Sequence, residues 1–184
     1  MRNPSMVGDR VYLRPLEPDD ADALAAASIL ETETIMDRGR VPVSPLAFAH
    51  WLEHLDASSP PHEVHFAVCL RGDPEPNRMI GLVNIEHLDW INRTGETGSG
   101  IFPASFRGQG YGTEAKRLLL TYAFDQLLLH ALHAYVWEPN HRSVAALRKQ
   151  GYRLAGRIQW TDVKDGCYRD TLVFDLLRDD WLAA

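Results

Sequence analysis

The sequence is poor in cysteine, in long apolar runs and in positive charge, and each shortage excludes a class of protein. Its two cysteines, Cys69 and Cys167, lie far apart and form neither a CxxC pair nor a metal-ligand spacing, so we expect reduced thiols in a cytoplasmic protein. No apolar run approaches the length of a membrane span, and the first residues lack the apolar core of an export signal. A net charge of −6 argues against general nucleic-acid binding and favours a cationic partner such as an amine.

The remaining composition is that of an ordinary globular protein, with 45% hydrophobic and 24% charged residues. A length of 184 residues is most simply one domain spanning 1–184, because such a chain can bury its own core. The hydrophobic periodicity predicts a first strand, two helices, three strands, a helix, a strand, a helix and two closing strands around a turn at Asp165-Gly166. This order predicts a mixed α/β (α+β) fold.

Three of the predicted helices carry an apolar stripe at helical spacing. The stripes are Ala21, Leu24, Ala25 and Ser28 in the first helix, Leu46, Ala49, Leu52 and Leu55 (with Phe48 and Trp51 beside them) in the second, and Ala115, Leu118, Leu119, Tyr122 and Ala123 in the third. Each stripe is expected to face the core.

The most informative segment is the glycine-rich run RGQGYGTEA at 107–115. Glycine has no Cβ, so such a loop can adopt left-handed dihedral angles and let an anion approach the main chain, where the N–H groups of the following helix point. A Walker loop would need a lysine and a hydroxyl residue that are missing here, and a dinucleotide fingerprint would have the spacing GxGxxG near the start of a βαβ unit. A third pattern, R/Q-x-x-G-x-G/A, is matched by Arg107, Gly110 and Gly112. A plain glycine-rich turn is the structural alternative.

The third pattern is the pyrophosphate loop of the GNAT acetyltransferases, and other segments fit the same family. A glycine-broken strand at 95–102 precedes the loop, and the sequences VWEPN at 136–140 and LRKQGY at 147–152 follow it. The run 80–181 resembles the GNAT superfamily, in particular the RimJ/RimL-like branch of ribosomal-protein N-terminal and polyamine acetyltransferases. The resemblance implies a GNAT fold: a mixed, mostly antiparallel, twisted sheet that splays between its fourth and fifth strands, with about four helices.

The resemblance also implies acetyl-CoA as cosubstrate, bound in the splayed sheet without a metal. The cofactor-binding residues that it implies are Ile101, Phe102, Arg107, Gly108, Gln109, Gly110, Tyr111, Gly112, Thr113 and Asn140. Gly98 and Gly100 are expected to bulge the strand before the loop and to free main-chain groups for the pantetheine amides. Asn140 could serve equally as a helix cap.

Two catalytic residues are predicted, Glu96 and Ser143. Glu96 occupies the family's acidic position in the fourth strand and is the candidate general base, with His87 as a weaker alternative and an exposed strand carboxylate as the structural one. Many relatives have a tyrosine general acid where this chain has Leu147. Ser143 is placed to donate a hydrogen bond to the sulfur of the leaving thiol, or else to cap its helix.

The expected acceptor is an amine, either a protein N-terminus or a small amine, and the acidic segment 31–37 could attract it. Relatives are commonly homodimers, and Trp160 falls where they line the acceptor pocket. His50 and His54, spaced i, i+4, could bind a metal in principle, but a solvated pair is expected. Two other functions stay open: a non-catalytic acyl-CoA sensor, and an unrelated nucleotide-binding regulator.

Overall fold

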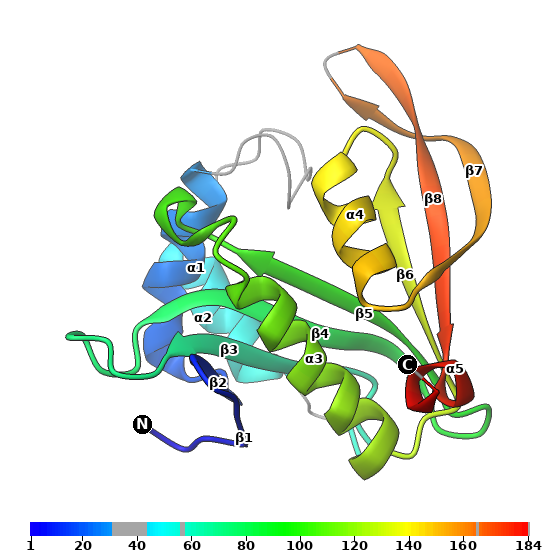
Figure 1. Ribbon diagram of the computed structural model, residues 1–184. Coiled ribbons are helices and arrows are strands. Elements are labelled where there is room, and N and C mark those ends of the chain that lie inside the picture. Colours follow the sequence, from blue (N-terminus) through cyan, green and yellow to red (C-terminus); the bar gives the residue numbers. More distant parts are fainter. Residues whose placement is uncertain (31–43, 56–57, 165, 184) are drawn as a thin grey trace.

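The computed structural model describes residues 1–30, 44–55, 58–164 and 166–183, and within them it shows a single sheet with helices on both faces (Figure 1). The strands are β1 (Met6–Val7), β2 (Val11–Pro15), β3 (Val64–Leu70), β4 (Met79–Asp89), β5 (Thr94–Ile101), β6 (Ala131–Trp137), β7 (Arg153–Lys164) and β8 (Cys167–Leu177). The helices are α1 (Ala21–Leu30), α2 (Pro45–His54), α3 (Tyr111–Thr121), α4 (His141–Lys149) and α5 (Arg178–Leu182).

The strand order is β1-β2-β3-β4-β5-β6-β8-β7, and every neighbouring pair is antiparallel except β5 and β6. The predicted mixed, mostly antiparallel sheet is therefore confirmed, as is the order of elements from β2 to β8. The strand β1 and the helix α5 were not predicted, because elements of two and five residues are too short to show a hydrophobic periodicity. No helix among the described residues is both long and apolar enough to cross a bilayer.

The parallel pair β5 and β6 opens into a V. The two strands pair only over Thr94–Glu96 and Ala131–His133, and beyond these residues they diverge (Figure 1). The main-chain edge of β5 from 97 to 101 thus faces an opening rather than a neighbouring strand. This confirms the predicted splay, and Glu96 lies at its vertex.

The bulge predicted at Gly98 and Gly100 is wrong. From Glu96 onward β5 pairs with β4 without a register shift, and the irregularity instead lies between Glu86 and Asp89 of β4. Gly98 has a different reason to be glycine, because a Cβ there would come within 2.2 Å of the Asn84 Oδ1 atom. The open edge of β5 results from divergence of the strands and needs no extra residue.

Two apolar clusters cover the two faces of the sheet. Helices α3 and α4 pack on one face through residues such as Leu119 and Val144, and α1 and α2 pack on the other through Leu24 and Phe48. Because β3 lies in the middle of the sheet, residues on both of its faces are buried, which explains why it reads as apolar almost throughout.

The predicted helix stripes are partly confirmed. In α1, Ala21, Leu24 and Ala25 are buried as expected, and the side chain of Ser28 lies outside the described part. The stripe of α2 is rotated, because Leu46 is exposed and Phe48 is the buried residue. The stripe of the third helix is largely confirmed, because Ala115, Leu119 and Ala123 are buried and Leu118 and Tyr122 pack half-buried against the same cluster. Lys116 and Leu120 are buried as well, outside the predicted stripe.

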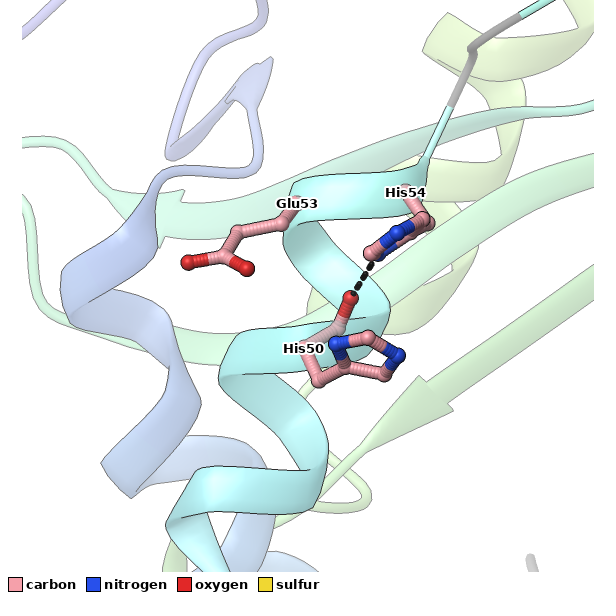
Figure 2. Close-up of side chains that lie close together, drawn as sticks. All are labelled: His50, Glu53 and His54. Carbon is pink, nitrogen blue, oxygen red and sulfur yellow. Dashed lines mark hydrogen bonds between the residues drawn. The ribbon is translucent and has the colours of Figure 1, made fainter.

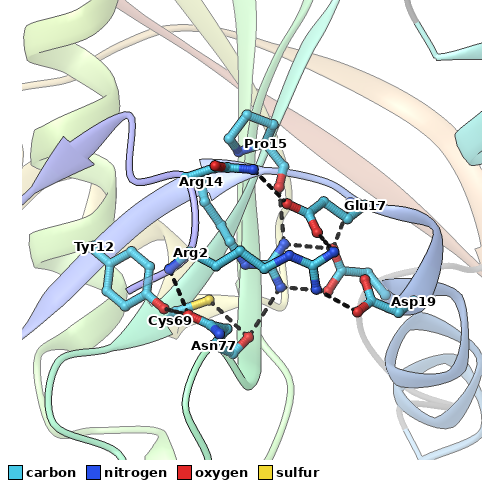
Figure 3. Close-up of polar contacts among 10 residues, drawn as sticks. Arg2, Tyr12, Arg14, Pro15, Glu17, Asp19, Cys69 and Asn77 are labelled. Atoms are coloured by element: carbon cyan, nitrogen blue, oxygen red, sulfur yellow. Dashed lines mark hydrogen bonds and ion pairs between the residues drawn. The ribbon is translucent and has the colours of Figure 1, made fainter.

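A buried ion pair fixes the start of α1 to β2. The Arg14 guanidinium donates two hydrogen bonds to the Asp20 carboxylate, at 2.8 and 2.7 Å, and a third to the main-chain oxygen of Asn77. Both side chains are almost fully buried, and Asp20 also accepts a hydrogen bond from the main-chain nitrogen of Glu17. Figure 3 shows Arg14 in the middle of this network, with Tyr12 and Asn77 beside it. The Asp20 pair raises the pKa of Arg14 above its usual range.

Candidate active site

The predicted phosphate loop leads into an uncapped helix. Gly110, with φ of 87°, is the N-cap of α3 and has no side chain with which to cap it. The first main-chain hydrogen bond of the helix runs from Glu114 N to the oxygen of Gly110 at 3.0 Å. Within the described residues, the N–H groups of Tyr111, Gly112 and Thr113 therefore have no acceptor, and the helix dipole adds partial positive charge at this end. These features make it a site suited to an anion.

Contacts from Arg10 and from the first residue of β2 hold the loop in place. Glu114, in the first turn of α3, accepts hydrogen bonds from the main-chain nitrogens of Arg10 and Val11 at 2.7 and 3.2 Å. The Arg10 guanidinium in turn donates to Glu114 and to the main-chain oxygen of Gln109, and it lies 5.0 Å from the centre of the Tyr111 ring. The loop is thus preorganised before any ligand arrives.

A cleft of about 320 Å³ runs from this loop along β5 to α4. Its lining combines the open edge of β5 at Ser99 and Ile101, the N-terminus of α3, and the first turn of α4. Arg107, Arg142 and Lys149 also line it, so a cation is available on several sides of a bound phosphate. The cleft has the charge and the exposed main chain that a diphosphate with an amide-bearing arm would need.

Most of the predicted cofactor-binding residues meet in this cleft. They are Ile101, Arg107, Gly108, Gly110, Tyr111, Gly112, Thr113 and Asn140. Phe102 is not among the lining residues: it is buried in the cluster beneath α1 and α2, its N–H donates to the oxygen of Ile80 at 2.9 Å, and its oxygen accepts from Arg107. Gln109 also lies beside the cleft and not in its lining; its side chain donates to the oxygen of Ser105.

Arg107 braces the turn between β5 and α3. Its guanidinium donates to the main-chain oxygens of Ile101, at 2.9 Å from Nε, and of Phe102. Burial lowers the pKa of Arg107, and the nearby charge of Arg142 lowers it further. The side chain therefore orients the end of β5 as well as adding positive charge to the cleft.

The N-terminus of α4 is capped by Asn140 and not by Ser143. Asn140 is the N-cap, and its Oδ1 atom accepts a hydrogen bond from the main-chain nitrogen of Ser143 at 3.1 Å. The capping alternative for Ser143 is therefore wrong, since Ser143 is the residue that is capped. Its side chain lines the cleft together with Asn140.

Glu96 lies at the vertex of the V, on the face of the sheet that α1 and α2 cover. Its cross-strand partners are Glu86 in β4 and His133 in β6. Burial raises the pKa of the Glu96 carboxyl above its usual value; the charges of His87, His133 and Lys116 act against that shift, and Glu86 adds to it. His87 Nε2 lies 3.8 Å from Glu96 Oε2 and is itself mostly exposed. Glu96 is half-buried, with 31% of its side chain exposed.

Three polar groups behind the vertex were not anticipated. The Thr97 hydroxyl donates to the oxygen of His133 at 3.1 Å and is 2.7 Å from the hydroxyl of Tyr152, which must then donate to it. Burial raises the pKa of Tyr152 above its usual range. Lys116 is 1% exposed, its Nζ lies 5.8 Å from the centre of the Tyr152 ring, and burial lowers its pKa to about 7 despite the attraction of Glu96. The apolar periodicity of α3 places position 116 outside the predicted stripe. The sequence therefore did not indicate that this lysine is buried.

The remaining predicted features lie away from the cleft. Leu147 is buried in the core, so the family's tyrosine position offers no proton donor here. Trp160 is largely exposed and stacks on Tyr168 at 5.3 Å, in the hairpin of β7 and β8. The acidic segment 31–37 lies outside the described residues.

The histidine pair of α2 gains a third neighbour in the structure. Ligand atoms of His50, Glu53 and His54 lie within 4.8 Å of one another, all on exposed side chains. Figure 2 shows that His54 Nδ1 already donates to the main-chain oxygen of His50, at 2.7 Å. One nitrogen of His54 is thus occupied within its own helix.

Comparison with known proteins agrees with this geometry. The family model described as "Acetyltransferase (GNAT) domain" matches residues 10–153. A Bacillus subtilis (strain 168) protein named "Putative ribosomal N-acetyltransferase YdaF" is 25% identical over 175 residues, 95% of each chain. "Probable N-acetyltransferase YjcK" from the same organism is 28% identical and covers 94% of this chain and 97% of its own.

The fold is shared with solved acetyltransferases. A spermidine N-acetyltransferase SpeG chimera from Vibrio cholerae and hSSAT superposes with a TM-score of 0.81 at 22% identity, covering 96% of this chain and 100% of that one. At that identity the likeness concerns the fold alone. The family model spans most of the chain and the named relatives are N-acetyltransferases, so the protein is an acyltransferase and belongs to the GNAT acetyltransferase family.

Proposed function

We propose that the chain transfers an acetyl group from acetyl-CoA to a primary amine, by direct attack in a ternary complex. The observation that carries the proposal is the uncapped N-terminus of α3, which opens into a cleft lined by the free edge of β5. The N–H groups of Tyr111, Gly112 and Thr113 would hold the diphosphate, and the pantetheine arm would lie along β5 towards Glu96.

The amine must be neutral to attack the thioester. Deprotonating a lysine-like amine at pH 7 costs about 4–5 kcal/mol, and a peptide N-terminus only about 1–1.5 kcal/mol, given their ordinary pKa values. Glu96 would accept the proton, directly or through water, and its raised pKa makes it a better base at neutral pH than an ordinary glutamate. Orienting amine and thioester together would supply much of the rate.

Departure of the thiolate has no tyrosine to assist it, because the residue at that position is the buried Leu147. A thiol with a pKa near 8.5 needs only about 2 kcal/mol of help at pH 7. Ser143 lines the cleft in the first turn of α4 and would donate a hydrogen bond to the sulfur. The acceptor is a protein N-terminus or a small amine; one B. subtilis relative is named a putative ribosomal N-acetyltransferase.

The first test is ligand binding followed by turnover. Thermal shift with acetyl-CoA, CoA and ATP should show stabilisation by the first two only, and thiol release should then appear with at least one member of a panel of peptides and amines. Glu96→Gln should lose the acid limb of the kcat/KM profile, which in the native enzyme lies above the usual glutamate range because burial raises the pKa of Glu96. Unchanged turnover of this variant across pH 6–9 would show that Glu96 is not the base.

A second function is kept because of Leu147. A chain that binds acetyl-CoA with the cleft described here but releases no thiol with any amine would be a non-catalytic acyl-CoA sensor. The same two assays separate the two functions, since binding is common to both and only the enzyme turns over.

A further inference from the structure

A second cluster of ligand groups lies on the far side of the sheet from the cleft. His65 of β3 pairs in register with Asn84 of β4, and Val64 pairs with Ile85. Because side chains alternate along a strand, Glu63, His65 and Glu86 project from the same face, the one covered by α1 and α2. One carboxylate oxygen from each glutamate and one ring nitrogen of His65 lie within 4.8 Å of one another.

His65 is the unusual member of this cluster. Its side chain is only 4% exposed, and neither ring nitrogen has a hydrogen-bond partner among the described residues. Its Nε2 lies 3.2 Å from Glu63 Oε2, close but without hydrogen-bond geometry, and the Trp51 ring packs edge-on against it at 5.2 Å. A buried polar group left without a partner costs about 1–3 kcal/mol, so the site is favourable only if something fills it.

We propose that Glu63, His65 and Glu86 bind a divalent transition-metal ion, with Zn²⁺ or Mn²⁺ as the fitting ions. One imidazole and two carboxylates match the ligand preferences of these ions, and two carboxylates neutralise the charge of a divalent cation. Three ligand atoms at about 2.1 Å from one ion lie roughly 3–4 Å apart, so small side-chain rotations from the present arrangement suffice.

The surroundings support a metal in two further ways. Asn84 Nδ2 donates to Glu86 Oε1 at 2.5 Å and so holds that carboxylate in place, as the outer-shell partners of metal ligands do. Glu63 and His65 also line a cavity of about 320 Å³ with Leu52, Leu55 and Tyr122, which gives an ion a path to the buried imidazole.

The ammonium group of an acceptor is the alternative occupant, because it too can donate to the carboxylates and to the imidazole lone pair. Three ligand atoms within 4.8 Å of one another suit a single ion, and the metal titration below separates the two occupants. Since Glu86 and Glu96 are cross-strand partners, the bound ion would lie one strand away from the candidate base. The site would thus place a fixed positive charge at the acceptor end of the active site.

The test is direct metal titration of the full chain after dialysis against a chelator. Calorimetry with Zn²⁺ and Mn²⁺, and visible absorption with Co²⁺, should show one site in the native protein. His65→Asn and Glu86→Gln should each weaken binding at least about tenfold, because each loses one ligand. The matched control is His54→Asn, which removes a histidine from the exposed cluster on α2 and should leave the affinity unchanged.

The result is independent of acetyl transfer, so failure of the proposed function would not affect it. Melting curves for each variant show whether it is folded before titration. The proposal would be overturned if the native protein bound no metal. It would also be overturned if binding survived both His65→Asn and Glu86→Gln but was lost in His54→Asn. The second outcome would place the metal on the surface of α2.

Discussion

Replacing Lys116 with methionine is expected to stabilise the protein at neutral pH. The native side chain is fully buried, and burial lowers its pKa from 10.5 to about 7. In the unfolded chain the same amine keeps its ordinary pKa and remains protonated, so folding near pH 8 requires it to give up a proton. Methionine has a similar length and no charge, and it adapts to the space left by the lysine stem.

The magnitude follows from the size of the shift. Each unit between the pH and the unfolded pKa of 10.5 costs about 1.4 kcal/mol. The penalty removed by Lys116→Met is therefore about 4 kcal/mol near pH 7.5 and about 2 kcal/mol near pH 9. Because the unfolded chain binds more protons in this window, Lys116 makes native stability rise with pH, and that contribution disappears in the variant.

Urea denaturation at pH 7.5 and 9 measures the difference directly, since other titrating groups cancel between the two proteins. The matched control is Arg117→Met, which removes a charge from the next residue of α3, where the side chain is exposed, and should change stability little. A variant that is no more stable than the native chain, or whose gain is the same at both pH values, would refute the assignment of Lys116 as a buried, deprotonated amine.

Three further substitutions test the loop, the N-terminal ion pair and the leaving group. Gly110→Ala should destabilise the protein by about 1–2 kcal/mol, because φ is 87° there, and should weaken the binding of CoA in a titration. The control is Gly156→Ala, where an added Cβ meets nothing within 4 Å. Equal effects of the two substitutions would contradict the strain argument. Asp20→Asn leaves the buried charge of Arg14 poorly compensated and should lower the free energy of unfolding, measured with urea, by about 3–5 kcal/mol. A loss under about 1 kcal/mol would be inconsistent with a buried ion pair. Ser143→Ala should lower kcat about tenfold with little change in the KM for acetyl-CoA, and unchanged kcat would exclude a hydrogen bond to the sulfur.

The sequence predicted the loop because its signal is local. Positive φ, close approach of an anion and an uncapped helix all demand glycine at fixed positions, so Gly108, Gly110 and Gly112 carry the information themselves. The splay of the sheet was also predicted, but through the family resemblance rather than from any residue. Nothing in the sequence of β5 or β6 states that their pairing stops after Glu96 and His133.

The errors have a common physical cause, which is that neighbours in space decide what a residue does. Gly98 suggested a bulge, yet it is glycine because the Asn84 side chain lies over it. Phe102 suggested a cofactor contact, yet its main-chain groups are taken by Ile80 and Arg107. Each of these partners is distant enough in sequence that period-two patterning cannot reveal it.

Charged residues in the interior were the hardest to foresee. Arg14, Asp20, Lys116 and Asp170 are all buried, and Lys116 is the one whose charge acts on Glu96. A lysine on a helix is expected at the surface, so the sequence pattern did not predict that Lys116 is buried. Its burial follows from the packing of α3 against the sheet. Burying it costs several kcal/mol by the argument above, a cost that an optimised core position would avoid. Below its pKa of about 7 Lys116 is protonated, and in that range its charge attracts Glu96 and favours the ionised carboxylate. Lys116→Met should gain stability and at the same time raise the pKa that governs the acid limb of kcat/KM, and a gain in stability with an unmoved acid limb would show that the lysine is an accident of packing.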